Sequence, residues 1–341
     1  MTTRSVVAAT LTCVLAGALL LPGGVAAADP AATCVPHDVA VSTLTVTGTM
    51  HGTLCLPDGP APGTVLLLVP GATYNSVYWD FPYQPETYSF VRAMTAAGHA
   101  TFAVDRLGTG GSTRPLSAQL TTLTQAAAVH DVVQALRAGE VGGHAFDQVV
   151  LGGHSLGSAI AIVEAATFHD VDALLVTGAS HVVNAVNAAV LLSTHLRSVA
   201  LDPGFPHHDP GYLTTVPGHR DAAFHAPDPV DPQVLAADEA SRDVVSATEA
   251  PDGLGLGFLA PYSALVTVPV LVAIGERDKY FCGLLLPQCT TAALQLRENV
   301  HYPLAPSVRT YVLPTAGHSF NLNPDAPVLH AEVLDWVNSV V

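Results

Sequence analysis

The segment at residues 148–168 constrains the fold of this chain more than any other. A β-branched run ending at Leu151 passes through glycines into a helical pattern, and the junction reads Gly153-His154-Ser155-Leu156-Gly157. A Gly-x-Ser-x-Gly junction holds its serine on a sharp strand-to-helix turn, with a strained backbone and an exposed hydroxyl. The amide dipoles of the following helix favour negative charge near Ser155. The alternative is a turn of small residues that only lets a helix pack closely on a strand.

Strand and helix patterns alternate on both sides of this segment. Apolar strand patterns occur at residues 64–69, 100–104, 173–177, 268–274 and 309–313, and two paired strands are predicted at residues 39–48 and 52–56. Helical patterns lie between them, which predicts right-handed β-α-β units and a mostly parallel, twisted sheet with helices on both faces. The fold class is therefore α/β, and functional residues should gather at the carboxyl ends of the strands.

The alternation breaks between residues 181 and 266. Helical pieces at residues 182–196 and 238–247 are joined there by links rich in Pro, His, Asp and Gly. A structureless loop of this length would be unusual inside a domain, so the segment is predicted to be an inserted, mainly helical cap. Residues 29–180 and 267–341 would then form the core.

The N-terminus, residues 1–28, has the pattern of a secretory signal peptide. Arg4 supplies a positive charge, an apolar run follows, and Ala26-Ala27-Ala28 is a small-residue cleavage pattern. We expect cleavage after Ala28, a secreted protein and no stable membrane anchor. An uncleaved anchor is disfavoured because the apolar run is short and is broken by Pro22-Gly23-Gly24.

Of the five cysteines, the four after residue 28 are Cys34, Cys55, Cys282 and Cys289. An even number in an exported chain predicts two disulfides, and four cysteines allow three pairings. We favour pairing between neighbours, Cys34–Cys55 and Cys282–Cys289. Zinc binding by these thiols is disfavoured because no Cys-x-x-Cys spacing occurs near them.

The formal net charge is −16, with only 12 basic residues. Such a chain offers no basic patch, which disfavours nucleic acid and other polyanions as partners. The 16 histidines would make the charge much less negative below about pH 6.

A serine hydroxyl is a poor nucleophile at neutral pH and needs a base, a group that orients the base, and donors for the oxyanion that forms. His318 follows the strand at residues 309–313, and Asp278 follows the strand ending at residue 274. The order Ser155, Asp278, His318 is the nucleophile, acid and base order of α/β-hydrolases. Glu276 is the rival for the acid, and either carboxylate could instead only cap a helix; we favour Asp278.

With these motifs, the chain resembles the α/β-hydrolase fold family over nearly all of its length after residue 28. The pieces that carry the resemblance are Pro70-Gly71, Asp105-x-x-Gly108-x-Gly110-x-Ser112, the Gly-x-Ser-x-Gly junction, Gly275-x-x-Asp278 and Gly317-His318. The family often has His-Gly where this chain has Pro70-Gly71. The resemblance implies that the amides of Ala72, or alternatively Thr73, and of Leu156 stabilise the oxyanion. Serine rather than aspartate at the junction argues against a dehalogenase or epoxide-hydrolase mechanism.

Other residues near these motifs have simpler explanations. Asp105 is expected to bond the backbone of its own glycine turn, and His154 to pack rather than react. His181 faces either the site or the base of the cap. His207-His208 resembles a metal pair but lacks a third ligand at a suitable spacing, so a solvated loop is favoured and no metal is expected. The aromatic loop at residues 74–83 could line an acyl pocket or only pack under the cap.

Together these observations predict a secreted serine esterase that forms an acyl-enzyme on Ser155 and requires no cofactor. The partner would be a small-molecule ester or lactone. A lactonase is one alternative, and an exported aminopeptidase-like hydrolase is another. The aminopeptidase would need a carboxylate cluster in the cap, where the acidic residues include Asp228, Asp231, Asp238, Glu239 and Glu249. A non-catalytic binding module is disfavoured because all three triad residues are present in order.

Overall fold

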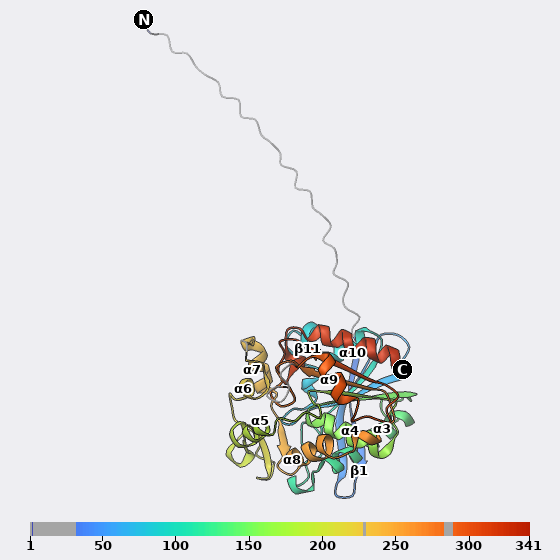
Figure 1. Cartoon of the computed structure of the whole chain (residues 1–341), viewed down its shortest axis with the longest axis horizontal. Helices are drawn as coiled ribbons and strands as arrows, with labels where there is room; N and C mark the ends of the chain where they lie inside the picture. Colours follow the sequence, from blue (N-terminus) through green and yellow to red (C-terminus); the bar gives the residue numbers. More distant parts are fainter. Residues whose placement is uncertain (1, 3–31, 228–229, 283–288) are drawn as a thin grey trace.

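The centre of the structure is an eight-stranded, mostly parallel sheet. The structure is a computed structural model that describes residues 2, 32–227, 230–282 and 289–341 (Figure 1). The strand order is β1-β2-β4-β3-β5-β6-β10-β11, in which β1 and β2 pair antiparallel, β2 pairs antiparallel with β4, and the other neighbours are parallel. Their bounds are β1 (Thr33–Ser42), β2 (Thr47–Leu56), β3 (Thr64–Val69), β4 (Ala100–Val104), β5 (Gln148–His154), β6 (Ala173–Thr177), β10 (Val270–Gly275) and β11 (Val308–Leu313). The predicted α/β class is confirmed.

Helices cover both faces of the sheet. On one face α3 packs on α4, and α10 lies on the opposite face (Figure 1). There α10 packs on α2. The helices outside the region between β6 and β10 are α1 (Pro85–Tyr88), α2 (Phe90–Ala96), α3 (Thr122–Ala138), α4 (Leu156–Phe168), α9 (Thr291–Glu298) and α10 (Ala326–Val340), with the short turns η1 (Ser76–Tyr78), η2 (Ser117–Gln119) and η7 (Phe320–Leu322). No helix of the described residues is both long and apolar enough to cross a membrane.

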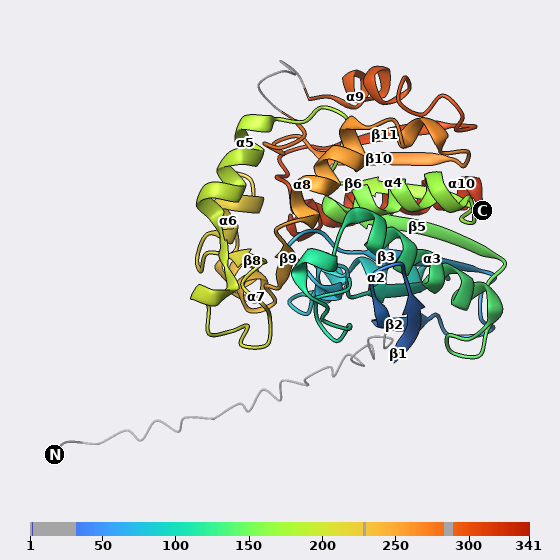
Figure 2. The same cartoon turned by 90° about the horizontal axis from the view of Figure 1, so that it is seen from below.

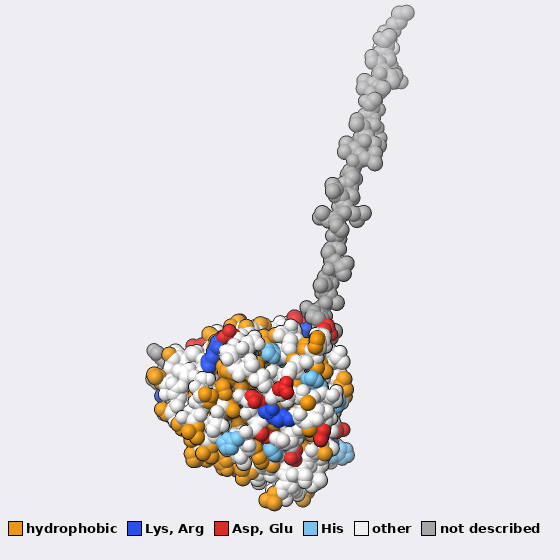
Figure 3. Space-filling view, turned by 90° about the vertical axis from the view of Figure 1, so that its right-hand side faces the viewer, with side chains coloured by type: hydrophobic (Ala, Val, Ile, Leu, Met, Phe, Trp, Pro, Cys, Tyr) orange, Lys and Arg blue, Asp and Glu red, His pale blue; other side chains and the backbone are white. Residues whose placement is uncertain are grey.

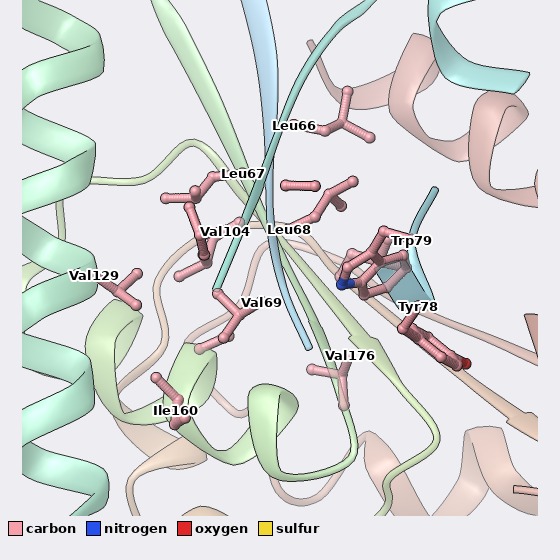
Figure 4. Packing of buried hydrophobic residues seen from close by; sticks show 14 of the residues in the cluster. Leu66, Leu67, Leu68, Val69, Tyr78, Trp79, Val104, Val129, Ile160 and Val176 are labelled. Carbon is pink, nitrogen blue, oxygen red and sulfur yellow. The ribbon is translucent and has the colours of Figure 1, made fainter. Parts of the chain in front are cut away.

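The core forms around β3, which is buried on both faces. Leu66, Leu67, Leu68 and Val69 are 0% exposed. Because side chains alternate along a strand, Leu67 and Val69 point toward the α3 and α4 side, whereas Leu66 and Leu68 point toward Trp79 (Figure 4). A central parallel strand sandwiched between helices therefore needs a continuous apolar run, as this sequence has.

The chain between β6 and β10, here called the β6–β10 segment, gathers at one side of the molecule (Figure 2). It contains α5 (Ala185–Val190), η3 (Leu191–His195), β7 (Leu196–Ser198), η4 (Val199–Leu201), β8 (Tyr212–Thr215), α6 (Arg220–Phe224), α7 (Pro232–Ala240), β9 (Val244–Ser246), α8 (Glu249–Leu254), η5 (Gly255–Leu259) and η6 (Ser263–Leu265). Strands β7, β8 and β9 form a separate antiparallel sheet that the sequence patterns did not predict. The helix expected at residues 238–247 ends at Ala240, because the β-branched Val244 and Val245 pair with β8 instead.

The first hairpin differs from the prediction. The turn lies at residues 43–46, where the Thr43 amide donates to the Val46 carbonyl across 2.8 Å, and β2 runs through His51 without a break. Gly52, which was predicted to begin the second strand, lies inside β2. Glycine is needed there because a Cβ would lie 2.7 Å from the Phe102 ring on β4. Gly52 therefore allows close packing inside the strand.

Both predicted disulfides are present. Cys34 on β1 lies opposite Cys55 on β2 and is bonded to it, and Cys282 is bonded to Cys289. The segment predicted as a signal peptide, residues 1–28, lies outside the described residues apart from Thr2.

Candidate active site

Ser155 lies on a strained turn between β5 and α4. Its φ of 53° and ψ of −114° place a non-glycine residue in a left-handed region, as the junction motif predicts. A Cβ on Gly153 would overlap the backbone of Gly157, and a Cβ on Gly157 would overlap the carbonyl of Val69. Both glycines are therefore required by the close approach of the helix to the sheet.

His318 joins Ser155 to Asp278. Its Nε2 lies 2.9 Å from Oγ of Ser155, and its Nδ1 lies 2.7 Å from Oδ2 of Asp278. Asp278 is 0% exposed, and its Oδ1 accepts hydrogen bonds from the amides of Tyr280 and Phe281. An ionised carboxylate only accepts, so Nδ1 carries the proton and Nε2 is free to accept from the serine hydroxyl. The three predicted triad residues thus form one hydrogen-bonded chain.

Glu276, the rival acid, points elsewhere. It is exposed, and its Oε2 accepts a hydrogen bond from the amide of Thr315 across 3.1 Å. Asp278 begins a turn that buries its carboxylate under the imidazole, whereas Glu276 holds the loop that precedes His318. Of the two carboxylates, only that of Asp278 contacts His318.

A largely apolar cavity of about 130 Å³ opens over Ser155 and His318. Its walls are mostly aliphatic and aromatic side chains of the β6–β10 segment and of the loops after β3, β5 and β10. They are Ala72, Tyr74, His154, Leu156, Val183, Ala188, Leu191, Leu192, Leu196, Phe224, Ala250, Pro251, Gly253, Leu254, Phe258, Tyr280 and Phe281. Such a surface excludes water and favours an apolar substrate group.

The loop after β3 places Ala72 at this cavity, opposite the start of α4. Within the described part of the chain, neither the amide of Ala72 nor that of Leu156 donates a hydrogen bond to another protein group. Thr73 is 0% exposed and does not line the cavity. The geometry is thus compatible with Ala72 and Leu156 as the two oxyanion donors.

The aromatic loop at residues 74–83 mainly packs. Tyr74 lines the cavity, but Tyr78, Trp79 and Phe81 are buried elsewhere in the core. Tyr78 stacks on the ring of His154, with 4.2 Å between ring centroids, and its hydroxyl lies 3.2 Å from Nδ1 of His154.

His154 is fully buried beside the nucleophile. Burial, together with the nearby His318, holds the pKa of His154 well below its ordinary value, so the ring is neutral at physiological pH. The contacts with Tyr78 make packing its evident role, as the sequence interpretation expected.

His181 belongs to a second hydrogen-bonded group, apart from Ser155. Its Nδ1 lies 2.7 Å from Glu298 on α9, and its Nε2 lies 2.9 Å from Oγ of Ser263. A carboxylate, a histidine and a serine are linked here in the same order as in a catalytic triad. However, Ser263 is 2% exposed and does not line the cavity. The arrangement ties both ends of the β6–β10 segment to α9. Of the two predicted orientations of His181, the structure shows the one at the base of that segment.

The remaining candidates have structural roles. Asp105 accepts hydrogen bonds from the amides of Gly111 and Ser76, as expected for its glycine turn. His208 contacts the carbonyl of Gly108 through Nε2 across 2.9 Å, and His207 is exposed.

Two buried arginines that the sequence patterns did not single out hold the loop after β3. Arg106 pairs with Glu249 across 2.6 Å and donates to the carbonyl of Gly71. Arg220 pairs with Asp238 across 2.8 Å and donates to the carbonyl of Thr73. All four charged side chains are 0% exposed.

The pairing with Arg220 also keeps the carboxyl group of Asp238 ionised. Burial alone would raise the pKa of Asp238, but the Arg220 charge and the hydrogen bond from His225 outweigh it and hold the pKa at about 2. The sequence does offer a signal for Arg106, because it follows Asp105 inside the Asp105-x-x-Gly108 motif. Arg220 lies in an irregular region with no such signal.

Comparisons with known proteins agree with this fold. A sequence model of the alpha/beta hydrolase family matches residues 66–331. A thermophilic esterase from Thermogutta terrifontis superposes with a TM-score of 0.60 at 15% identity, covering 90% of this chain and 99% of that one. Est1E from Butyrivibrio proteoclasticus, solved with ferulic acid, gives 0.54 at 14% identity, covering 86% and 96%. An enol-lactonase from Burkholderia xenovorans gives 0.54 at 17% identity, covering 85% and 97%. At these identities the structures show a shared fold. No curated protein sequence matches the chain significantly.

Proposed function

We propose that this chain, which belongs to the alpha/beta hydrolase family, is a secreted serine hydrolase that cleaves carboxylic esters. The observation that carries the proposal is the continuous hydrogen-bonded chain from Ser155 through His318 to Asp278 at the floor of an apolar cavity. A serine in this arrangement has a base within reach, and the base has its own orienting carboxylate.

The reaction follows from these contacts. Nε2 of His318 takes the hydroxyl proton of Ser155 as Oγ attacks the ester carbonyl, and Asp278 stabilises the resulting imidazolium. The oxyanion of the tetrahedral intermediate receives hydrogen bonds from the amides of Ala72 and Leu156. His318 then protonates the departing alcohol, leaving an acyl group on Ser155. Water, deprotonated by the same imidazole, releases the acid and restores the serine.

The cavity supports an ester with an apolar acyl or alcohol group. Much of its wall comes from residues 181–266, which we propose to act as a cap that selects the substrate. The solved structures of the same fold include esterases and an enol-lactonase, so a cyclic ester belongs to the same reaction class.

Of the acidic residues named for the cap, Asp231, Asp238 and Glu249 do not support an aminopeptidase, and Asp228 lies outside the described residues. Asp238 forms a buried ion pair with Arg220, and Glu249 forms one with Arg106. Asp231 accepts a hydrogen bond from Tyr83. None of these three carboxylates lines the cavity over Ser155. A free amine would therefore find no counter-charge from them.

Secretion is supported by the pattern of residues 1–28 and by the two disulfides, because disulfides persist mainly in oxidising compartments. A small-molecule partner is supported by the surface. On the face shown in Figure 3, Lys and Arg side chains occupy only small, separate areas among hydrophobic and uncharged ones.

A fluorophosphonate probe combined with p-nitrophenyl esters tests the proposal. We expect covalent labelling and ester hydrolysis by the wild type, and neither by Ser155→Ala. Ser263→Ala is the matched control, because Ser263 also contacts a histidine that contacts a carboxylate, and it should keep both activities. Failure of the wild type to be labelled, or labelling that persists in Ser155→Ala, would refute the assignment.

A further inference from the structure

Three ligand-type side chains converge near the far end of α4 from Ser155. His130 on α3, Glu164 on α4 and Asp170 in the loop after α4 each offer one donor atom, and these atoms all lie within 4.8 Å of one another. Helices α3 and α4 pack side by side (Figure 2), which brings the side chains of His130 and Glu164 together between them. His169, with φ of 52°, ends α4 in a left-handed turn before Asp170.

The polar atoms of this group are incompletely satisfied. Glu164 is 0% exposed, and neither of its carboxylate oxygens has a hydrogen-bond partner; Oδ1 of Asp170 is also buried without one. Arg137, the nearby cation, donates instead to the carbonyl of Asp170 and to the carboxylate of Asp172. Oδ2 of Asp170 receives hydrogen bonds from His130 and Gln134, but the Glu164 carboxylate beside it has no donor. Burying the Glu164 carboxylate in this way is costly unless a cation or a proton joins it to Asp170.

We propose that His130, Glu164 and Asp170 bind a divalent transition-metal ion of the Zn²⁺ or Mn²⁺ type. One imidazole nitrogen and two carboxylates suit such ions, whereas Ca²⁺ takes six to eight oxygen ligands. The side chains of His130 and Asp170 are 28% and 15% exposed, so the ion can enter from solvent and keep water ligands on that side.

Neighbouring groups already orient two of the three ligands. The ring of Phe168 stacks on His130 with centroids 4.0 Å apart and planes 10° from parallel. Nε2 of Gln134 donates to Oδ2 of Asp170 across 2.6 Å, which leaves Oδ1 of that carboxylate available. Partners of this kind fix the orientation of metal ligands and tune their affinity.

Binding would join α3, α4 and the loop after α4, and would therefore act on stability rather than on the ester reaction. This proposal goes beyond the esterase assignment and does not depend on it. Its readouts are bound metal and the melting temperature of the full chain.

The test uses protein stripped with EDTA and dialysed against ZnCl₂, MnCl₂ or CaCl₂. We expect about one equivalent of Zn²⁺ or Mn²⁺ by mass spectrometry of the metal and a rise in melting temperature of about 5 °C or more, with no response to CaCl₂. Glu164→Gln and His130→Gln should each abolish the rise. His51→Gln is the matched control, because His51 pairs with Asp38 at the same 2.7 Å as His130 with Asp170, and it should respond like the wild type.

The outcome that overturns the proposal is equally measurable. If the stripped wild type takes up no equivalent of Zn²⁺ or Mn²⁺, or if uptake and the thermal shift survive both Glu164→Gln and His130→Gln, the site does not bind metal. If no metal is taken up, a shared proton joins the carboxylates of Glu164 and Asp170. The melting temperature of the isosteric variant Glu164→Gln should then lie within a few degrees of that of the wild type. Melting curves in EDTA confirm that each variant is folded before its response to metal is read.

Discussion

Oδ2 of Asp278 accepts a hydrogen bond from Nδ1 of His318 across 2.7 Å, and the two side chains are 0% and 5% exposed. Asp278→Asn keeps the shape of the side chain but removes the negative charge and favours the wrong tautomer of His318. We expect kcat for a p-nitrophenyl ester to fall by about 10³- to 10⁴-fold. Glu276→Gln, two residues away and exposed, should change kcat by less than about threefold, because a surface group far from the reacting atoms contributes little. A comparable loss in both variants would contradict the assignment of the acid.

The sheet and the triad could be predicted because their signals are local. The run at β3 is apolar throughout, since both of its faces are covered. Ser155 is marked by glycines that the turn requires. Asp278 and His318 each follow a strand pattern closely, and the carboxyl ends of neighbouring parallel strands meet at one edge of the sheet.

The features that the sequence did not predict depend on contacts between residues distant in sequence or on strands too short to show a pattern. Arg220 and Asp238 are paired by the packing of α6 on α7, and Arg220 reaches Thr73, 147 residues away. Strands of three or four residues, such as β7 and β8, are too short to show a period. Gly52 was predicted to begin the second strand rather than to lie inside it, because the approach of Phe102 is invisible in the sequence.

Leu192 offers a test of the cavity as the substrate site. It lines the cavity and is 40% exposed, so a charge can be placed there without burial in the core. Leu192→Asp should raise KM for an apolar ester roughly tenfold, because the substrate loses an apolar contact, with little change in kcat. Leu201→Asp is the control: Leu201 also belongs to the β6–β10 segment but is 70% exposed and does not line the cavity. Equal effects of the two substitutions would place the substrate elsewhere.

The buried Arg220–Asp238 pair should matter far more to stability than a surface pair. Asp238→Ala leaves the Arg220 guanidinium buried without a counter-charge, and we expect the free energy of unfolding to fall by about 3–5 kcal/mol. Asp335→Ala removes one of the partners of Arg309, which also pairs with Glu332. The side chains of Asp335 and Arg309 are 73% and 37% exposed, so the substitution should cost at most about 1 kcal/mol. Chemical denaturation of the two variants and the wild type measures the difference. Similar losses would mean that the buried pair is not specially required.

The stability of the protein should decrease in weak acid, partly because of His330. Burial lowers the pKa of His330 to about 4, and its Nε2 donates to Oδ1 of Asn321 across 2.6 Å. In the unfolded chain the pKa of a histidine is about 6.5. Between these values the unfolded state binds a proton that the folded state does not. The contribution of His330 to stability is therefore fully present above pH 6.5 and falls by about 3 kcal/mol as the pH decreases to 4.

His330→Gln retains a donor toward Asn321 but cannot be protonated. The slope of the unfolding free energy between pH 6.5 and 4 should become shallower by about 1 kcal/mol per pH unit. His207→Gln, at an exposed position, should keep the wild-type slope. The prediction is wrong if the His330 variant loses stability with pH as steeply as the wild type.

The Cys282–Cys289 disulfide should affect catalysis more than the Cys34–Cys55 disulfide does. The amide of Cys282 donates to the carbonyl of Asp278 across 2.7 Å, so this bond anchors the turn that orients the triad acid. The other bond joins the hairpin of β1 and β2 at the edge of the sheet. We expect the double variant Cys282→Ser/Cys289→Ser to lose kcat at temperatures where its far-ultraviolet circular dichroism is still native. Cys34→Ser/Cys55→Ser should keep kcat up to its melting temperature, because the hairpin does not contact His318. If the first double variant keeps full kcat until it unfolds, the bond only stabilises the fold, and the position of Asp278 is determined by the hydrogen bonds of its own carboxylate with Tyr280 and Phe281.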